Sequence, residues 1–245
     1  MESFVGTLFI VATPIGNLED ITYRALNVLK QASFIAAEDT RRTRILLNHY
    51  QLSTPTISYH DYNKKKQGEK LLKMLLAGNS IALVSDAGTP SISDPGYYLV
   101  NLAIQNNIKV TPVPGVSAVI AALSVSGLPS DRFAFEGYLP KKKNPRRKRI
   151  QQIKAEDRTI IIYESPYRIT STLQEILDIF GDRWVVVARE LTKIYEEIIR
   201  GCLSGIIEEF AEKKMRGEFT ILITSARISE KLLSSNKKVA PKTYL

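Results

Sequence analysis

Short apolar runs alternate with helical spacings through the first half of this chain. The pattern predicts strands over 7–12, 33–37, 81–84 and 108–111, and helices over 20–31, 40–50, 67–77 and 94–106. Val, Ile and Leu dominate the strands, which is typical of strands buried on both faces. Parallel strands joined by helical crossovers follow from this order. The first half is therefore predicted to be an α/β domain with a mostly parallel sheet.

The second half is richer in strands. A small-residue helix over 116–126 leads into it, and strands are predicted over 133–138, 159–163, 184–189, 195–201 and 219–224, with helices over 146–155, 167–180 and 203–214. This content fits a mixed sheet flanked by helices. We expect an N-terminal α/β domain over 1–115, a C-terminal α/β domain over 116–228, and a basic, flexible tail over 229–245.

Three unusual loops follow three of the predicted strands of the first half. They span 12–20, 85–96 and 112–118, and each combines Gly or Pro with small polar residues. Gly88 allows a tight turn and a close approach of the backbone to a ligand. One such loop alone could be a structural turn. Three loops at the carboxyl ends of parallel strands indicate one ligand site.

Composition narrows the class of protein. Hydrophobic residues make up 44% and charged residues 24%, as in soluble globular proteins. No apolar run approaches the roughly 20 residues that span a bilayer. Cys202 is the only cysteine, and His49 and His60 are the only histidines. An internal disulfide is thus excluded, a metal site is disfavoured, and a cytoplasmic location is expected.

The net charge of +9 is concentrated in two clusters. The segment 141–149 holds seven cations, with Pro140 and Pro145 arguing against a continuous helix and for a mobile loop. A second cluster, 64–66, follows Tyr59, His60 and Tyr62, whose rings could stack on bases. A solvated face is the alternative for each cluster. We interpret both as RNA contacts, together with cations at the start of the helix over 40–50: Arg41, Arg42, Lys64, Lys65, Lys141, Lys142, Lys143, Arg146 and Arg147.

Seven short motifs occur in a characteristic order: 13–22, 37–43, 85–96, 114–118, 163–168, 188–193 and 217–219. In them the chain resembles the S-adenosylmethionine-dependent methyltransferases of the tetrapyrrole-methylase type. It is most similar to the ribosomal RNA small subunit methyltransferase I family. The resemblance runs from the first strand to about residue 224.

This resemblance implies a site and an activity. The donor, S-adenosylmethionine, would lie in a cleft between the two domains, and the product would be a 2′-O-methylcytidine in 16S RNA of the small ribosomal subunit. The pairing of such two-domain units implies a homodimer. G-x-G-x-x-G is absent, as expected for a donor without a pyrophosphate. The implied donor-binding residues are Pro14, Ile15, Asp86, Gly88, Thr89, Ile92, Ser117, Ala118, Tyr163, Leu191 and Phe219.

The donor loop departs from the relatives that act on tetrapyrroles. They have Gly-Asp-Pro where this chain has Gly88-Thr89-Pro90, and the carboxylate lies instead at Asp86. Either Asp86 takes over the carboxylate's role or Thr89 does the work differently.

A ribose hydroxyl must lose its proton during methylation, so a base is expected. The candidates are Glu38, Asp39, Glu190 and Lys193. Glu38 and Asp39 could instead cap the helix at Thr40, and Glu190 could form a structural ion pair. We favour Glu190 and Lys193 as catalytic residues.

Two other functions fit parts of the pattern. One is a small-molecule methyltransferase acting on a tetrapyrrole, which the clustered cations disfavour. The other is a non-catalytic RNA-binding assembly factor, which the complete set of donor-loop residues disfavours.

Overall fold

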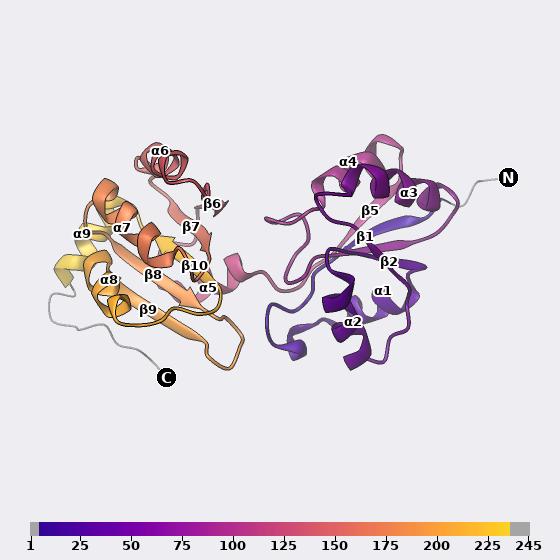
Figure 1. Cartoon of the computed structure of the whole chain (residues 1–245), viewed down its shortest axis with the longest axis horizontal. Helices are drawn as coiled ribbons and strands as arrows, with labels where there is room; N and C mark the ends of the chain where they lie inside the picture. The colour runs from indigo at the N-terminus through magenta and orange to yellow at the C-terminus, as the bar shows by residue number, and fades with distance from the viewer. Residues whose placement is uncertain (1–4, 236–245) are drawn as a thin grey trace. The chain divides into compact units, whose positions relative to one another are not determined.

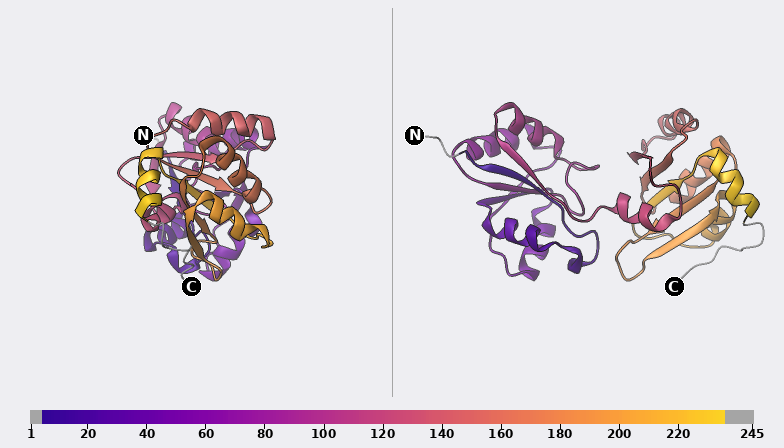
Figure 2. Two further views of the ribbon diagram at one scale, coloured as in Figure 1. Left: turned by 90° about the vertical axis from the view of Figure 1, so that its left-hand side faces the viewer. Right: turned by 180° about the vertical axis from the view of Figure 1, so that it is seen from behind.

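The structure, a computed structural model, describes residues 5–235. The chain divides into two compact units, with the boundary between Ser117 and Ala118. Figures 1 and 2 show the elements of each unit from three directions.

The first unit is built on a five-stranded sheet. Its order is β3-β2-β4-β1-β5 and all its strand pairs are parallel, as the sequence predicts. The strands are β1 (Thr7–Val11), β2 (Phe34–Ala37), β3 (Thr56–Ser58), β4 (Ile81–Val84) and β5 (Lys109–Val113). The helices are the short 3₁₀ turn η1 (Leu18–Asp20), α1 (Tyr23–Gln31), α2 (Thr40–His49), α3 (Lys64–Leu76) and α4 (Tyr97–Gln105).

Both faces of this sheet are buried, since apolar residues fill consecutive positions of the strands. Successive residues of β4 point to opposite faces, so Ala82 packs in the same cluster as Leu29 of α1, while Leu83 packs with Leu71 of α3. Helices α1 and α2 cover one face, and α3 and α4 cover the other (Figure 1).

The neighbouring strands β1 and β4 send their chains to opposite faces of the sheet. The chain leaving β1 enters α1, whose Ala25 belongs to one apolar cluster, and the chain leaving β4 enters α4, whose Leu99 belongs to the other. Such a switch point opens a crevice at the carboxyl ends of the two strands, where α/β proteins bind ligands.

The second unit has a mixed sheet of order β6-β7-β10-β8-β9, in which only β6 and β7 are parallel. The mixed character matches the sequence prediction. The strands are β6 (Phe133–Tyr138), β7 (Thr159–Glu164), β8 (Trp184–Arg189), β9 (Glu197–Cys202) and β10 (Phe219–Ile223). The helices are α5 (Ala118–Ser126), α6 (Lys143–Ile153), α7 (Ile169–Phe180), α8 (Leu203–Ala211) and α9 (Ala226–Ser235).

One face of this sheet holds the main core of the second unit. Alternate residues of the strands, such as Ile162 and Val187, pack against α6, α7 and α8 through Ile150, Leu173 and Ile206. Helix α5 lies against β10. Among the described helices of both units, none combines the length and apolarity needed to cross a membrane.

Two sequence predictions are wrong, and one strand was missed. The helix predicted over 146–155 begins earlier, at Lys143, so 143–149 is not a mobile loop; Pro145 falls in the first turn, where an N–H has no helical acceptor. Residues 229–235 belong to α9, so the predicted flexible tail does not begin at 229, and its remainder over 236–245 lies outside the described residues. Strand β3 was not predicted, since it has only three residues and none is buried.

Candidate functional site

The loops after β1 and β4 are joined at the switch point by Thr13 and Gly88. Each of these residues donates its backbone N–H to the other's carbonyl oxygen, at 2.9 Å in both directions. Gly88 adopts a φ of +79°, and a Cβ built there would lie 3.3 Å from Cγ2 of Ile15. Only glycine takes this backbone conformation without strain. The sequence therefore places glycine where two ligand loops meet.

The loop after β4 keeps an unusual backbone conformation beyond Gly88. Ser91 and Ser93 both have positive φ values, 73° and 65°. Positive φ values are uncommon at residues other than glycine, and residues that have them cluster at ligand sites. The loop is also tied to the chain after β5, because the Thr89 hydroxyl donates to the Val116 carbonyl at 3.0 Å. Thr89 thus connects two of the three predicted loops.

Asp86 has a structural role in the first unit. Its carboxylate accepts the backbone N–H of Asp39 at 3.0 Å and lies 3.5 Å from a guanidinium nitrogen of Arg42. It thereby joins the ends of β4 and β2. Burial, together with the negative charge of Asp86, raises the pKa of the Glu38 carboxyl. Glu38, which follows β2 at this edge of the sheet, is therefore more easily protonated than an ordinary glutamate.

Asp39 is the N-cap of α2, as one of the two sequence readings predicts. It accepts hydrogen bonds from the Arg41 backbone N–H at 2.9 Å and from the Arg41 guanidinium. These bonds hold the pKa of Asp39 well below its usual range. A carboxyl so committed to Arg41 is a poor candidate for a base.

The remaining donor candidates of the first unit lie in the same loops. Pro14 is buried and Ile15 is half-buried, while Ile92 is 41% exposed. Ser117, and Ala118 at the start of the second unit, follow the loop after β5 and are half-buried. The structure thus brings together, at one edge of the parallel sheet, the loops that carry Pro14, Ile15, Asp86, Gly88, Thr89 and Ile92.

In the second unit, Tyr163, Leu191 and Phe219 share one end of the mixed sheet. Phe219 pairs with Glu164, the neighbour of Tyr163, and with Arg189, two residues before Leu191. Leu191 and Phe219 are buried, while Tyr163 is half-buried and its ring packs against those of two neighbours, Phe135 and Tyr138.

Glu190 and Lys193 belong to a polar cluster at this end of the sheet. The Lys193 ammonium donates to Oε1 of Glu190 at 2.7 Å and to Oε2 of Glu218 at 3.0 Å. The Glu218 backbone N–H also donates to Oε1 of Glu190. Gly217 leaves room for this carboxylate, because a Cβ there would lie 2.4 Å from Cδ of Glu190.

The protonation states in this cluster are set by opposing effects. Burial raises the pKa of Glu190, but the hydrogen bonds from Lys193 and from the Glu218 N–H outweigh it and lower the pKa overall. Burial likewise lowers the pKa of Lys193, while its bonds to the two carboxylates outweigh it and raise the pKa overall. Glu190 is therefore ionised and Lys193 is charged at neutral pH. Because its pKa is lowered, the ionised Glu190 carboxylate can accept a proton only from a group that is itself strongly acidic.

The cluster's second carboxylate, Glu218, was not predicted as a site residue. Glu218 and Gly217 were recognised only as part of a motif, and the hydrogen bond from Glu218 to Glu190 spans 28 residues of sequence. A pairing of that separation leaves no local pattern. The spacing of Glu190 and Lys193, three residues apart, was the only feature of the sequence that indicated this cluster.

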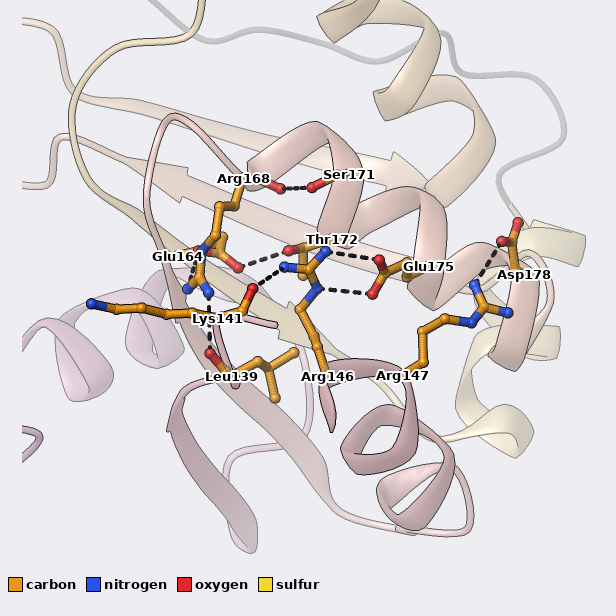
Figure 3. A network of polar contacts seen from close by, with 10 residues as sticks. All are labelled: Leu139, Lys141, Arg146, Arg147, Glu164, Arg168, Ser171, Thr172, Glu175 and Asp178. Atoms are coloured by element: carbon orange, nitrogen blue, oxygen red, sulfur yellow. Dashed lines mark hydrogen bonds and ion pairs between the residues drawn. The ribbon is translucent and has the colours of Figure 1, made fainter. Parts of the chain in front are cut away.

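The basic segment over 141–149 contains two kinds of cation. Lys141, Lys142 and Lys143 are exposed and form none of the ion pairs found among residues 5–235. Arg146 is 6% exposed and binds both oxygens of Glu175 at 2.8 Å (Figure 3). The prediction that Arg146 contacts RNA is therefore wrong, because its donors are used inside the unit.

Arg147 lies beside this buried pair. It is half-buried and donates to Asp178 at 3.2 Å (Figure 3). Because Arg147 is already paired with Asp178, although the pair is partly accessible, it is a weaker candidate for RNA contact than Lys141, Lys142 and Lys143.

The cations and rings of the first unit also separate into two groups. Tyr62 is fully exposed, and the neighbouring Lys65 is exposed. Tyr59 is 1% exposed, and its hydroxyl oxygen accepts the Leu99 N–H; because the ring is buried, the stacking role expected for Tyr59 is wrong. Lys64 pairs with Asp61 at 3.0 Å.

The fold and the loops define a class of protein. The family described as Tetrapyrrole (Corrin/Porphyrin) Methylases matches residues 7–207, and the chain belongs to this family. Solved structures agree on the fold. A cobalt precorrin-4 methyltransferase of cobalamin biosynthesis has a TM-score of 0.67 at 18% identity, covering 89% of this chain and 94% of that one. A uroporphyrin-III C-methyltransferase from Thermus thermophilus, complexed with S-adenosylhomocysteine, has a TM-score of 0.63 at 18% identity, covering 91% of this chain and 100% of that one.

Closer relatives place the chain within one branch of the family. Ribosomal RNA small subunit methyltransferase I of Thermotoga maritima is 50% identical over 220 residues, covering 90% of this chain and 99% of the relative. The protein of the same name from Halalkalibacterium halodurans is 50% identical over 218 residues, covering 89% and 75%. The chain is thus a member of the ribosomal RNA small subunit methyltransferase I branch.

Proposed function

We propose that this protein transfers a methyl group from S-adenosylmethionine to the 2′-oxygen of a cytidine in the RNA of the small ribosomal subunit. The observation that carries the proposal is the junction of the two ligand loops by Thr13 and Gly88 at the switch point. The chain that contains this junction is 50% identical to a protein named as a ribosomal RNA methyltransferase. The two solved methyltransferases described above are 18% identical to this chain, whereas the two relatives named for ribosomal RNA are 50% identical, which favours RNA over a tetrapyrrole.

The donor-loop residues fit an S-adenosyl group. Around Gly88 a tight turn lies against the apolar side chain of Ile15 and close in sequence to the buried Pro14, a setting that suits an adenosine lacking phosphates. The donor, when bound, would supply an electrophilic methyl on a sulfonium. The loops' task is to hold it in line with the acceptor oxygen, which accounts for much of the rate of such a displacement. By resemblance, the same ligand is proposed to contact Ile92, Ser117, Ala118, Tyr163, Leu191 and Phe219.

Glu190 is proposed to accept the proton of the ribose hydroxyl. As the new O–C bond forms, the hydroxyl oxygen gains positive charge and its proton becomes strongly acidic. A carboxylate with a lowered pKa can accept such a proton. Lys193 is proposed as the positioning residue, because its ammonium holds Oε1 of Glu190 at 2.7 Å. Glu38, whose pKa is raised, is the competing base.

The exposed cations are proposed to position the RNA. Lys141, Lys142 and Lys143 can contact phosphates, and Tyr62 offers a ring on which a base can stack. Phosphate contacts contribute affinity without choosing the nucleotide, so they would orient the subunit rather than select the target. The proposal includes a homodimer, by resemblance, and a sedimentation mass of one chain at micromolar concentration would refute that part.

The test is methyl transfer to small ribosomal subunits lacking the modification, with the labelled nucleotide identified after digestion. We expect a 2′-O-methylcytidine. The triple variant with Lys141, Lys142 and Lys143 changed to Ala should bind RNA more weakly and with a flatter salt dependence, while donor affinity stays unchanged. Lys30→Ala with Lys109→Ala is a control that removes exposed cations elsewhere in the chain. Label on a base carbon, or on no RNA at all, would refute the proposal.

A further inference from the structure

Arg183 of the second unit carries a buried charge that no carboxylate of the described residues neutralises. The residue is 6% exposed, and among residues 5–235 no Asp or Glu oxygen lies within ion-pair distance of its guanidinium. Its hydrogen bonds go to two carbonyl oxygens, of Thr224 at 3.4 Å and of Lys154 at 3.2 Å, and its guanidinium carbon lies 4.4 Å above the Phe180 ring. Buried charges are normally paired, so this one indicates an anionic ligand.

Arg183 lines a cavity of about 460 Å³ within the second unit, here called the Arg183 pocket. Four more cations line it. Lys154 and Arg227 are exposed and outside the ion pairs found in the described part, whereas Arg132 and Arg158 pair with acidic residues of the same pocket. The acidic residues of the pocket are already paired with other arginines: Asp131 and Asp157 with Arg132, and Glu156 with Arg158. The pocket is therefore left with a surplus of positive charge.

The N-terminus of α9 opens onto the same pocket. Ser225, Ala226 and Arg227 line it, and the first α-helical bond runs from the Ser229 N–H to the Ser225 carbonyl. The amides of the first turn have no acceptor within a helix, and they favour an anion. A separate observation points to a ligand: Thr224 is 1% exposed, lines the pocket, and its hydroxyl oxygen has no hydrogen-bond partner in the described structure.

This pocket lies at the other end of the mixed sheet from Tyr163, Leu191 and Phe219. Thr159, which begins β7, lines the pocket, and Thr224 directly follows β10. Strands of five residues separate the two ends by roughly 16 Å. The Arg183 pocket is therefore distinct from the residues assigned to the donor and to catalysis.

We propose that the Arg183 pocket binds a phosphate group of the RNA backbone, through the guanidinium of Arg183, the first turn of α9 and the exposed cations Lys154 and Arg227. A guanidinium, free helix amides and a hydroxyl are the groups that recognise phosphate oxygens. The assignment to RNA rests on the proposed function, whereas the affinity for phosphate does not. A contact this far from the reacting end would orient the RNA on the second unit.

The test compares the wild type with the double variant Lys154→Ala, Arg227→Ala, which changes only exposed side chains. Thr224→Val removes the unpartnered hydroxyl and keeps its shape. Lys30→Ala with Lys109→Ala is the control of equal charge. In the first arm, thermal unfolding is followed in sodium phosphate and in sodium chloride of equal ionic strength. We expect phosphate to raise the Tm of the wild type and the control, and to raise it less in the double variant and in Thr224→Val.

The second arm measures affinity for a small-subunit RNA fragment as a function of salt. Losing the contact with one phosphate should weaken binding severalfold and flatten the slope of log K against log salt by about 0.7–0.9. Equal phosphate shifts in the wild type and the double variant would overturn the site. A lost phosphate shift with unchanged RNA affinity and slope would assign the pocket to a free phosphate compound and overturn its role in RNA binding. Failure of methyl transfer by the wild type would refute the proposed function and leave the first arm standing.

Discussion

Thr13 and Gly88 exchange both backbone hydrogen bonds across the switch point of the first unit. The pair fixes the loops after β1 and β4 to each other in a conformation that requires a positive φ at Gly88. Neither residue contributes a reactive group. Their effect is to hold the surrounding backbone in a defined shape for a ligand.

Gly88→Ala should weaken donor binding. A Cβ at φ +79° costs about 1–2 kcal/mol and presses on Ile15 at 3.3 Å, so relief would require moving one of the two loops. We expect the affinity for S-adenosylmethionine, measured by titration calorimetry, to fall about tenfold or more. Gly127→Ala is the matched control, because Gly127 has a φ of +73° and nothing within 4 Å of a Cβ. Equal donor affinity in the two variants would remove the loop from the site.

Much of this fold was predictable, since the strands of the parallel sheet are apolar runs such as Ile81–Val84, buried at every position. The sequence predictions were wrong where a residue type was taken to indicate a single kind of local structure. Pro145 argued for a loop but occupies the first turn of α6, and the polar segment after Ser225 forms α9 because one stripe of it packs on the unit, with Ser229 accepting the Trp184 N–H.

The site was less predictable than the fold. Loops at strand ends can be recognised locally, which is why the sequence could mark Gly88 and Ile15 as predicted donor contacts. The environment of a charge depends on residues distant in sequence. Arg146 and Lys142 look alike in the chain, but Glu175, 29 residues beyond Arg146, makes Arg146 structural. Arg183 was not singled out at all, because its lack of a carboxylate is a property of the folded unit alone.

Gly217→Ala should disrupt the cluster around Glu190. The added methyl would lie 2.4 Å from the Glu190 side chain, which must then leave its position against Lys193 and the Glu218 N–H. If Glu190 accepts the proton, kcat for methyl transfer should fall while donor affinity changes little. Gly181→Ala, at φ +80° in open space, carries the same backbone strain and should leave kcat near the wild-type value. Similar kcat values for both variants would argue that the position of Glu190 does not matter.

Arg146→Ala should destabilise the protein rather than weaken RNA binding specifically. Removing one partner of a buried, doubly hydrogen-bonded pair leaves Glu175 charged and unpaired, which costs about 3–5 kcal/mol. The free energy of unfolding in urea measures this loss. Lys142→Ala, an exposed neighbour, should leave the unfolding free energy unchanged and reduce RNA affinity. The reverse pattern would mean that Arg146, and not the lysines, faces RNA.

Glu190→Gln should change how the free energy of unfolding depends on pH. The pKa of Glu190 is lowered in the folded chain, so its ionised form stabilises the fold above its ordinary value of 4.5. That contribution is lost as pH falls through the folded-state pKa. The unfolding free energy of the wild type should therefore exceed that of the variant at pH 7, and the difference should shrink below about pH 4.5. A difference that stays constant from pH 7 to pH 3 would show that Glu190 does not titrate in the way its contacts with Lys193 require.

The same variant separates the two proposed bases. If Glu190 accepts the ribose proton, Glu190→Gln should lower kcat strongly at every pH from 6 to 9, since the wild-type group is already ionised throughout that range. Glu38→Gln should then leave kcat nearly unchanged. If Glu38 is the base, its raised pKa predicts an acid limb in the wild-type profile of kcat/KM that disappears, with most of the activity, in Glu38→Gln. A Glu190→Gln enzyme that retains wild-type kcat would transfer the catalytic assignment from the second unit to the carboxylate beside Asp86.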